Sequence, residues 1–257
     1  MDIIFLGTGG GRINLIKQVR GTGGFRINSK SANIHVDPGP GALLHSKRVR
    51  QRPVELDAII VTHRHIDHFS DAMVMIEGMT RYGLEKKGIL IGSQHVIDGD
   101  EHGDRGVHTY HQQKVTEVYS ARFGERKKFT TPKGEFEIEV FEMKHDEPTA
   151  FGFKLHLDGK VVGYITDTEY RPEFGREFSG CDYLIVNCIK PESDEYHGHL
   201  KTADVIEILK TARPKNCIMT HLGLKMLKVG PELEAKKIQD ASGVRTIAAM
   251  DGMIISF

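Results

Sequence analysis

The chain lacks the features that mark disulfide-rich, secreted or membrane-spanning proteins. Its 257 residues include three cysteines, an odd number without a Cys-x-x-Cys pair, so we expect a reducing compartment rather than a disulfide framework. Its apolar runs are too short to span a bilayer, and residues 1–6 lack the basic start and long apolar region of a secretory signal. We therefore expect a cytoplasmic protein that does not enter a membrane.

An excess of one charge is also missing. Lysine plus arginine and aspartate plus glutamate each total 35, which gives zero formal charge and no global field that favours nucleic acid or an acidic membrane. The local basic run Lys47, Arg48, Arg50 and Arg52 is typical of a solvated helix end. Nucleic acid therefore stays an open partner that the sequence does not favour.

Short β-like runs and helical patterns fill most of the chain. Because no repeat or low-complexity linker interrupts them, we expect a single domain over residues 1–257. The predicted strands are 3–6, 33–36, 58–61, 89–91, 136–141, 150–156, 161–165, 183–186, 218–219, 245–248 and 253–255, and the predicted helices are about 40–49, 71–82, 202–212 and 231–241. This mixture predicts an α/β fold in which a sheet-on-sheet core is flanked by helices.

Three local details complete this outline. Asp158-Gly159 predicts a hairpin turn, and Thr202 can cap the helix that follows it. Residues about 93–131 form the least regular part, which we interpret as an insert or lid near the functional site. The spacing of its four histidines matches no set of metal ligands, so we expect them at the surface. They are His95, His102, His108 and His111.

The most informative segment runs from Thr62 to His68, directly after an apolar strand. His63 and His65 are two residues apart, so on an extended segment their side chains point the same way. Asp67 and His68 are adjacent and diverge, so they can reach a second point in space. The spacing differs from the paired histidines four apart of a metalloprotease helix. One loop can therefore supply ligands to two metal positions.

Three further residues repeat the order of strand and then candidate ligand. His145, Asp167 and His221 each follow a β-like run. Taken singly, each is as easily a surface or turn residue, but together they complete a ligand set for two metals. The two oxygens of one carboxylate can bridge two cations, a role that suits Asp167.

Two histidines precede the helix predicted at 202. With enough ligands already assigned, we interpret His199 as the group that protonates a leaving oxygen or stabilises a developing negative charge. His197 fits a solvated loop as well as a place in the site.

The glycine-rich segment 7–11 follows the first strand, but it does not match a dinucleotide-binding pattern. The sixth position of that pattern is Arg12 rather than glycine, and no clear helix opens there. We expect the backbone of this loop to pack closely against the site, where side chains would obstruct. Asp37 could cap a helix, hydrogen-bond a metal ligand or do neither, and a supporting role near the site is favoured. Cys188 and Cys217 lie in apolar runs and are expected to be buried structural thiols.

These motifs resemble the metallo-β-lactamase superfamily from the first strand to the closing strands. The resemblance rests on Thr62 to His68, on the later ligands in the same order, and on residues 5–10, Phe-Leu-Gly-Thr-Gly-Gly. It implies a four-layer αββα sandwich with a two-metal site at one sheet edge. It also implies that the first metal is held by His63, His65 and His145, the second by Asp67, His68 and His221, and that Asp167 bridges them.

Within this superfamily the chain is most similar to ribonuclease Z and to phosphonate-pathway phosphodiesterases, in which a histidine near position 199 assists phosphate-ester cleavage. The long Gly-Pro-rich arm with which ribonuclease Z grips transfer RNA is not found, which puts processing of that RNA in doubt. A true β-lactamase is disfavoured by the bridging Asp167 and the missing secretory signal.

The sequence therefore predicts a dinuclear metal-dependent hydrolase, with a phosphodiesterase using a metal-bridged hydroxide as the preferred function. Asp67 would ligate and orient the water, and His199 would assist the leaving oxygen. The imidazole and carboxylate ligands favour two zinc ions, with manganese or iron open. The expected substrate is a small-molecule or nucleotide phosphodiester. An ester, thioester or lactone hydrolase, a non-catalytic metal-binding module and a homodimer remain open.

Overall fold

A computed structural model describes residues 1–192 and 198–256 of the chain, so the prediction for His197 lies outside the described residues. Its strands are β1 (Asp2–Phe5), β2 (Phe25–Asn28), β3 (Asn33–Val36), β4 (Ala58–Val61), β5 (Ile89–Gly92), β6 (Glu117–Ser120), β7 (Arg126–Thr131), β8 (Gly134–Glu142), β9 (Phe151–Leu157), β10 (Lys160–Ile165), β11 (Tyr183–Lys190), β12 (Leu200–Lys201), β13 (Asn216–Thr220), β14 (Arg245–Ala248) and β15 (Ile254–Ser256). Its helices are α1 (Arg12–Lys17), α2 (Ala42–Arg48), η1 (Pro53–Glu55), α3 (Ile66–Phe69), α4 (Ala72–Met79), α5 (Gln94–Ile97), α6 (Thr109–Gln112), α7 (Phe174–Glu177), α8 (Thr202–Ala212), α9 (Leu224–Val229) and α10 (Pro231–Ser242).

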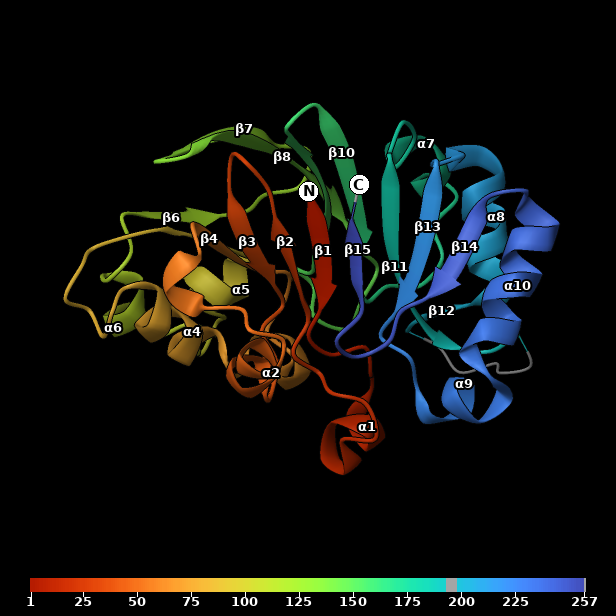
Figure 1. Ribbon diagram of the computed structural model, residues 1–257, viewed down its shortest axis with the longest axis horizontal. Helices are drawn as coiled ribbons and strands as arrows, with labels where there is room; N and C mark the ends of the chain where they lie inside the picture. Colours follow the sequence, from red (N-terminus) through yellow and green to blue (C-terminus); the bar gives the residue numbers. More distant parts are fainter. Residues whose placement is uncertain (193–197, 257) are drawn as a thin grey trace.

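Two mixed sheets form the centre of the molecule. The first has the strand order β15-β1-β2-β3-β4-β5-β6, and β3 to β6 run parallel to one another. The second has the order β14-β13-β11-β10-β9-β8-β7, with β12 beside β11, and its strands β10, β11, β13 and β14 are parallel. Figure 1 shows the two sheets facing each other with helices outside both.

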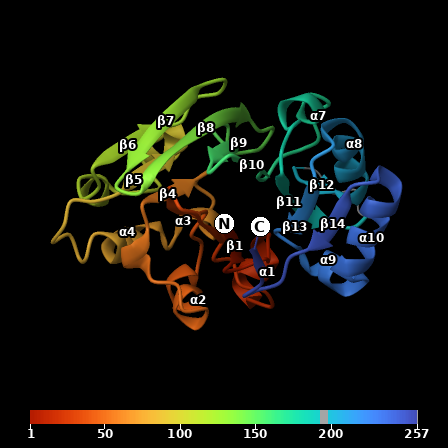
Figure 2. The same cartoon turned by 45° about the horizontal axis from the view of Figure 1, so that its top comes forward.

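Three buried clusters hold these layers together. The largest lies between the sheets and contains Phe25 and Ile60 of the first sheet and Phe153 and Ile185 of the second. A second cluster packs the second sheet against α8 and α10, and a third packs the first sheet against α2 and α4. The helices lie on the two outer faces (Figure 2), so the predicted four-layer αββα sandwich is confirmed.

The strands that precede the predicted site residues all run toward one edge of the sandwich. In the first sheet β1 and β4 end there, because β2 is antiparallel to both β1 and β3, and β4 is parallel to β3. In the second sheet β8, β10, β11 and β13 end there, because β9 is antiparallel to both β8 and β10, and β11 and β13 are parallel to β10. The two sheets are in contact at this edge, because the backbone N–H of Phe151 in β9 donates to the carbonyl of Thr62, just after β4, at 3.2 Å. Residues distant in sequence therefore meet at this edge.

All of the predicted strands and all four predicted helices are confirmed, with ends that shift by a few residues. The turn at Asp158-Gly159 is also confirmed, because it joins β9 to β10. The prediction that Thr202 caps a helix is wrong. Thr202 is the first residue of α8, and the Asp204 carboxylate accepts the N–H of Lys201, which holds the cap position.

The segment 93–131 is not the irregular lid that we predicted. It contains α5 and α6 and adds β6 to the edge of the first sheet and β7 to the edge of the second. The exposed face of β7 carries the polar residues Arg126, Lys128 and Thr130. Because polar residues make up so much of this edge strand, the sequence shows no apolar run there that would predict a strand. The expectation that no helix opens at Arg12 is also wrong, because α1 begins there.

Candidate metal centre

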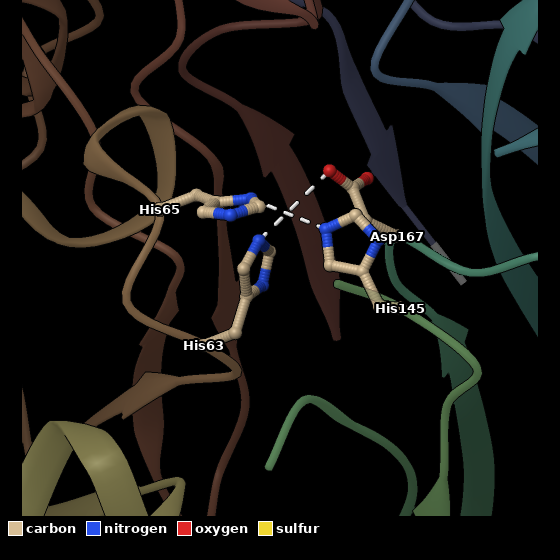
Figure 3. A group of neighbouring side chains, drawn as sticks. All are labelled: His63, His65, His145 and Asp167. Atoms are coloured by element: carbon tan, nitrogen blue, oxygen red, sulfur yellow. Dashed lines mark hydrogen bonds and ion pairs between the residues drawn. The ribbon is translucent and has the colours of Figure 1, made fainter. Parts of the chain in front are cut away.

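The first group of candidate ligands combines the loop after β4 with the ends of β8 and β10. Nδ1 of His65 lies 3.1 Å from Nε2 of His145, and Nε2 of His63 lies 3.9 Å from Oδ2 of Asp167 (Figure 3). One ligand atom from each of the four residues lies within 4.8 Å of all the others. The group could hold a metal ion, and it is the first set that the sequence predicted.

The second group combines α3 with the end of β13. Nε2 of His221 lies 3.2 Å from Nε2 of His68 and 3.3 Å from Oδ2 of Asp67. These three residues also offer ligand atoms within 4.8 Å of one another. The structure therefore brings together every residue that the sequence predicted as a ligand.

Asp167 lies between the two groups. Its Oδ2 is 3.9 Å from Nε2 of His63 and 3.4 Å from Nε2 of His68, while its Oδ1 is 3.3 Å from Nδ1 of His221. The same Oδ1 accepts a hydrogen bond from Nδ2 of Asn187 at 2.7 Å. Asn187 was not predicted, although a polar residue in the otherwise apolar run of β11 was a signal for it.

Asp37 has the supporting position that the sequence favoured. Its Oδ2 lies 2.9 Å from Nδ1 of His68 and accepts the hydroxyls of Thr62 and Tyr164 at 2.8 and 3.1 Å, while its Oδ1 accepts the Thr62 N–H. The contact with Nδ1 places the His68 proton on that nitrogen and turns the Nε2 lone pair toward the second group.

The glycine-rich loop packs against the centre, as predicted. A Cβ on Gly10 would lie 2.1 Å from Nδ1 of His221, so only glycine allows this approach. Backbone hydrogen bonds from Gly10 to Leu222 and from Leu222 to Thr8 join the loop to the segment after β13. The Asp251 carboxylate accepts the Thr8 N–H and hydroxyl and, through its other oxygen, the N–H of Gly21.

His199 lies beside the bridging position. Its side chain is 17% exposed, its Nδ1 is 3.7 Å from Oδ2 of Asp167, and its ring centroid is 5.3 Å from that of His145. Asp167, His199 and His221 also form a group that could hold a metal. Geometry alone thus permits His199 to act either as a ligand or as a group that contacts the substrate.

Buried polar groups that were not predicted contact residues on either side of His199 in the sequence. Nζ of Lys190 donates to the His199 carbonyl at 3.2 Å. Oε2 of the buried Glu234, on α10, accepts the Glu192 N–H at 3.2 Å and the Thr202 hydroxyl. Glu192 and Thr202 thus donate to the same carboxylate oxygen.

The two site carboxylates are held in their charged form. Burial opposes the ionisation of Asp167, but His221, His199 and His68 hold the pKa of its carboxyl well below the ordinary value. Burial acts the same way on Asp67, and His68 and His221 again lower the pKa. Both are therefore carboxylates at neutral pH, the form that binds cations.

The imidazoles respond to burial and to these carboxylates. Burial lowers the pKa of His63 well below its ordinary value and lowers the pKa of His199 to about 4, so both rings are neutral at neutral pH. Burial also disfavours the charged form of His68, but Asp167 and Asp37 raise its pKa well above the ordinary value. The space between the carboxylates thus favours positive charge, which a proton or a metal ion can supply.

The residues present fit divalent metal ions. Among the candidate ligands, three buried ring nitrogens have no hydrogen-bond partner in the described part of the chain: Nε2 of His63, Nδ1 of His145 and Nδ1 of His221. Pairs of ring nitrogens face each other at 3.1 and 3.2 Å, an arrangement that a shared cation stabilises. Neutral imidazoles and carboxylates without thiolate form a donor set that suits zinc and other divalent metals.

A cavity of about 1180 Å³ opens from the centre. Its lining includes the candidate ligands His65, Asp67, His145 and Asp167, together with His199, residues 10–15, Ile66, Lys144, Ile189, Lys190, Leu224 and Lys225. No residue of 93–131 is among the described residues that line it. The cavity is large enough for an organic substrate as well as the group that reacts.

The other predictions have mixed outcomes. His102 and His108 are exposed as expected, but His95 is half-buried with Nδ1 2.6 Å from a Glu147 oxygen, and His111 lies 3.3 Å from Glu77. Cys188 and Cys217 are buried, as expected, and Cys181 is buried as well; all three cysteines are free. Among the described residues no helix combines the length and apolar character that crossing a bilayer requires.

Comparisons with known proteins agree with this geometry. The family model described as "Beta-lactamase superfamily domain" matches residues 32–222. The chain is 34% identical over 255 residues to the uncharacterized protein MJ1374 of Methanocaldococcus jannaschii, covering 98% of this chain and 94% of that one. It is 24% identical over 278 residues to a ribonuclease Z of Sulfolobus acidocaldarius, covering 92% and 93% of the two chains. The crystal structure of the metallo-β-lactamase fold protein YhfI of Bacillus subtilis superposes with a TM-score of 0.80 at 19% identity, covering 99% and 98%.

Proposed function

Since this chain belongs to the metallo-β-lactamase superfamily of metal-dependent hydrolases, we propose that it is a dinuclear phosphodiesterase. The observation that carries the proposal is the convergence of two ligand groups on Asp167, with the imidazole of His199 next to them. The ribonuclease Z among its relatives cleaves by name a nucleic acid, which supports phosphate-ester chemistry.

The ligands divide into two sets around the bridging carboxylate. His63, His65 and His145 would hold one ion, and the other would be held by Asp67, His68 and His221. Zinc is favoured by the donor set, and manganese or iron is the alternative. Bound divalent metals polarise phosphoryl oxygens and lower the pKa of water toward about 7, so that hydroxide is available at neutral pH.

The protein's own groups then orient the reaction. Asp67 lies on the cavity wall with an oxygen 3.3 Å from His221, where it can accept a hydrogen bond from a water and aim that water at phosphorus. His199 also lines the cavity, and as a neutral imidazole it can donate its ring N–H to the departing oxygen as negative charge develops there. Asp37 acts indirectly, because it orients the His68 ring.

The first test replaces His199 by alanine and measures both metal content and hydrolysis of bis(p-nitrophenyl) phosphate. We expect the metal content to stay at the wild-type level and kcat to fall about 10²- to 10³-fold, because one hydrogen-bond donor to the transition state is lost. His156→Ala is the matched control, since this histidine lies near the end of β9, is not a candidate ligand and does not line the cavity. Loss of metal in His199→Ala would instead make His199 a ligand and would reverse its role.

Cleavage of an ester, thioester or lactone is the competing activity, because the same hydroxide attacks a carbonyl carbon. A panel of bis(p-nitrophenyl) phosphate, a cyclic nucleotide, a lactone and a thioester separates the two. A kcat/KM that is highest for a carbonyl substrate would overturn the phosphodiesterase assignment and leave the metal centre in place. A single domain over 1–257, a cytoplasmic location and a homodimer stay predictions.

A further inference from the structure

Helix α1 exposes apolar side chains that core packing does not explain. Ile13 and Ile16 are 63% and 82% exposed, and Val19, just after the helix, is 59% exposed. The one residue of α1 that is buried is Asn14, which exchanges two hydrogen bonds with the backbone of Arg20, at 2.9 and 3.1 Å. Polar contacts therefore anchor the helix, and its isoleucines are left facing outward.

The start of this helix is fixed against the candidate metal centre. Gly10 packs on the His221 ring, and a Cβ on Gly11 would lie 2.8 Å from Cδ1 of Ile189. The helix projects beyond the edge of the sheets at which the ligands meet (Figure 1). Its side chains thus have a fixed position relative to the reacting group.

Part of α1 forms a wall of the cavity that opens from the centre. Ile13 and Leu15 line it, and Ile66, which is 55% exposed, Ile189 and Leu224 add further apolar surface. Ligand pockets typically measure about 300–1000 Å³, and the volume of about 1180 Å³ here far exceeds what a phosphate group fills. The wall is therefore suited to the organic part of a substrate.

The positively charged side chain of Arg12 lies at the start of the same wall. Arg12 is exposed and lines the cavity, and its guanidinium has no hydrogen bond or ion pair with any residue in 1–192 or 198–256. Its guanidinium is a strong donor to phosphate oxygens, and its aliphatic stem extends the apolar surface. A phosphate offers this guanidinium charged acceptor oxygens, which an uncharged ester or thioester does not.

We propose that α1 makes the enzyme specific for nucleotide phosphodiesters, in which a nucleobase packs on Ile13 and Ile66 and a phosphate lies next to Arg12. A nucleoside has a flat apolar face joined through a polar sugar to an anion, which matches an apolar wall with a cation at its edge. This inference rests on the proposed phosphodiesterase function and goes beyond it by naming the substrate class.

The test compares two substrates with the same leaving group, thymidine 5′-(p-nitrophenyl phosphate) and methyl p-nitrophenyl phosphate. We expect the metal-loaded wild type to prefer the thymidine ester by about tenfold in kcat/KM, since apolar contacts of this size contribute about that much. Ile13→Ser should lose most of the preference through a higher KM. Ile16→Ser should keep it, because Ile16 lies on the same helix but does not line the cavity.

A second pair of variants examines the cation. Arg12→Gln should raise KM about tenfold for the thymidine ester, while Lys17→Gln, at the other end of α1 and outside the cavity lining, should leave it unchanged. Equal kcat/KM values for both substrates, or equal effects of Ile13→Ser and Ile16→Ser, would overturn the assignment of α1 and leave the phosphodiesterase proposal standing.

Failure of the proposed function gives a different result. If the wild type cleaves neither substrate, the phosphodiesterase proposal falls, and α1 is then tested by calorimetric binding of thymidine 5′-monophosphate to the metal-loaded protein. Wild type and Ile16→Ser should bind about tenfold more tightly than Ile13→Ser. Equal affinities of the three proteins would overturn the role of α1 as well.

Discussion

The two ligand groups share Asp167 but differ in how the rest of the molecule holds them. In the second group, Asp37 orients His68, Gly10 packs against His221, and a Cβ on Gly39 would lie 1.9 Å from the Asp67 carbonyl oxygen. Each of these contacts comes from a loop of the first sheet. The second group is therefore enclosed by backbone and buried polar groups before any ligand binds.

The first group is more open. The His65 side chain is 33% exposed, and the carboxylate nearest to its ring belongs to Asp146, which is 64% exposed and lies 3.4 Å away. Asp146 is also 3.1 Å from Nε2 of His145, and all three residues line the cavity. The difference indicates that the second group is held more firmly by its surroundings, whereas the first has more contact with solvent through His65 and Asp146.

The largest effect is expected from Asp167→Asn, because this change acts on both groups at once. Loss of the bridging charge should remove metal from both positions and lower kcat on the order of 10³-fold or more. Metal per chain by mass spectrometry and the rate with bis(p-nitrophenyl) phosphate measure it. The control Asp240→Asn removes an exposed carboxylate of α10 and should change neither. A variant that keeps two metals and wild-type turnover would show that the groups do not depend on Asp167.

A smaller effect is expected from Asp37→Asn, because this change acts on the second ligand group and not on the first. Replacing a carboxylate that orients a ligand typically lowers metal affinity about 10- to 100-fold, and here it should do so at one of the two positions. Competition with a chelator of known affinity measures this. Asp146→Asn is the matched change beside the first group, and because Asp146 is exposed we expect less than about a threefold change. Equal losses in the two variants would remove the distinction between an enclosed and an open group.

The smallest effect on the metal centre itself is expected at His35, which is buried like His68 but has no carboxylate beside it, so that its replacement acts on stability. Its Nε2 donates to the Gly23 carbonyl at 2.8 Å, and burial lowers its pKa to about 4. The unfolded chain binds a proton near pH 6.5 and the folded chain does not. The free energy of unfolding therefore keeps the full contribution of the neutral His35 above that pH. It decreases as the pH falls toward 4, by about 3 kcal/mol at most.

Urea unfolding of wild type and His35→Gln between pH 4 and 7 isolates this contribution. Glutamine keeps a donor for Gly23 and does not titrate, so the free energy of unfolding should depend less steeply on pH in the variant. Parallel curves for the two proteins would mean that the pKa of His35 is the same in the folded and the unfolded chain, which would contradict this prediction.

The sequence predicted the parts of this centre that depend on local order. His63 to His68 follow a buried strand within six residues, and His145, Asp167 and His221 each follow strands whose alternation and apolar character are readable. Contacts such as those of Asn187 and Glu234 could not be predicted, because a hydrogen bond across 20 or more residues depends on packing that no local pattern encodes. The edge strand β7 was missed for the related reason that its exposed face is polar.

The contacts of Asp251 determine when the centre can form during synthesis. This carboxylate fixes Thr8 and Gly21, which flank the loop that packs on His221, across more than 200 residues. A growing chain emerges from the ribosome with its amino end first. The loop with Gly10 thus stays without this anchor until residue 251 has been added, and the second ligand group cannot take its final geometry earlier. Metal binding at the second group, as proposed, would therefore follow the addition of residue 251 to the chain.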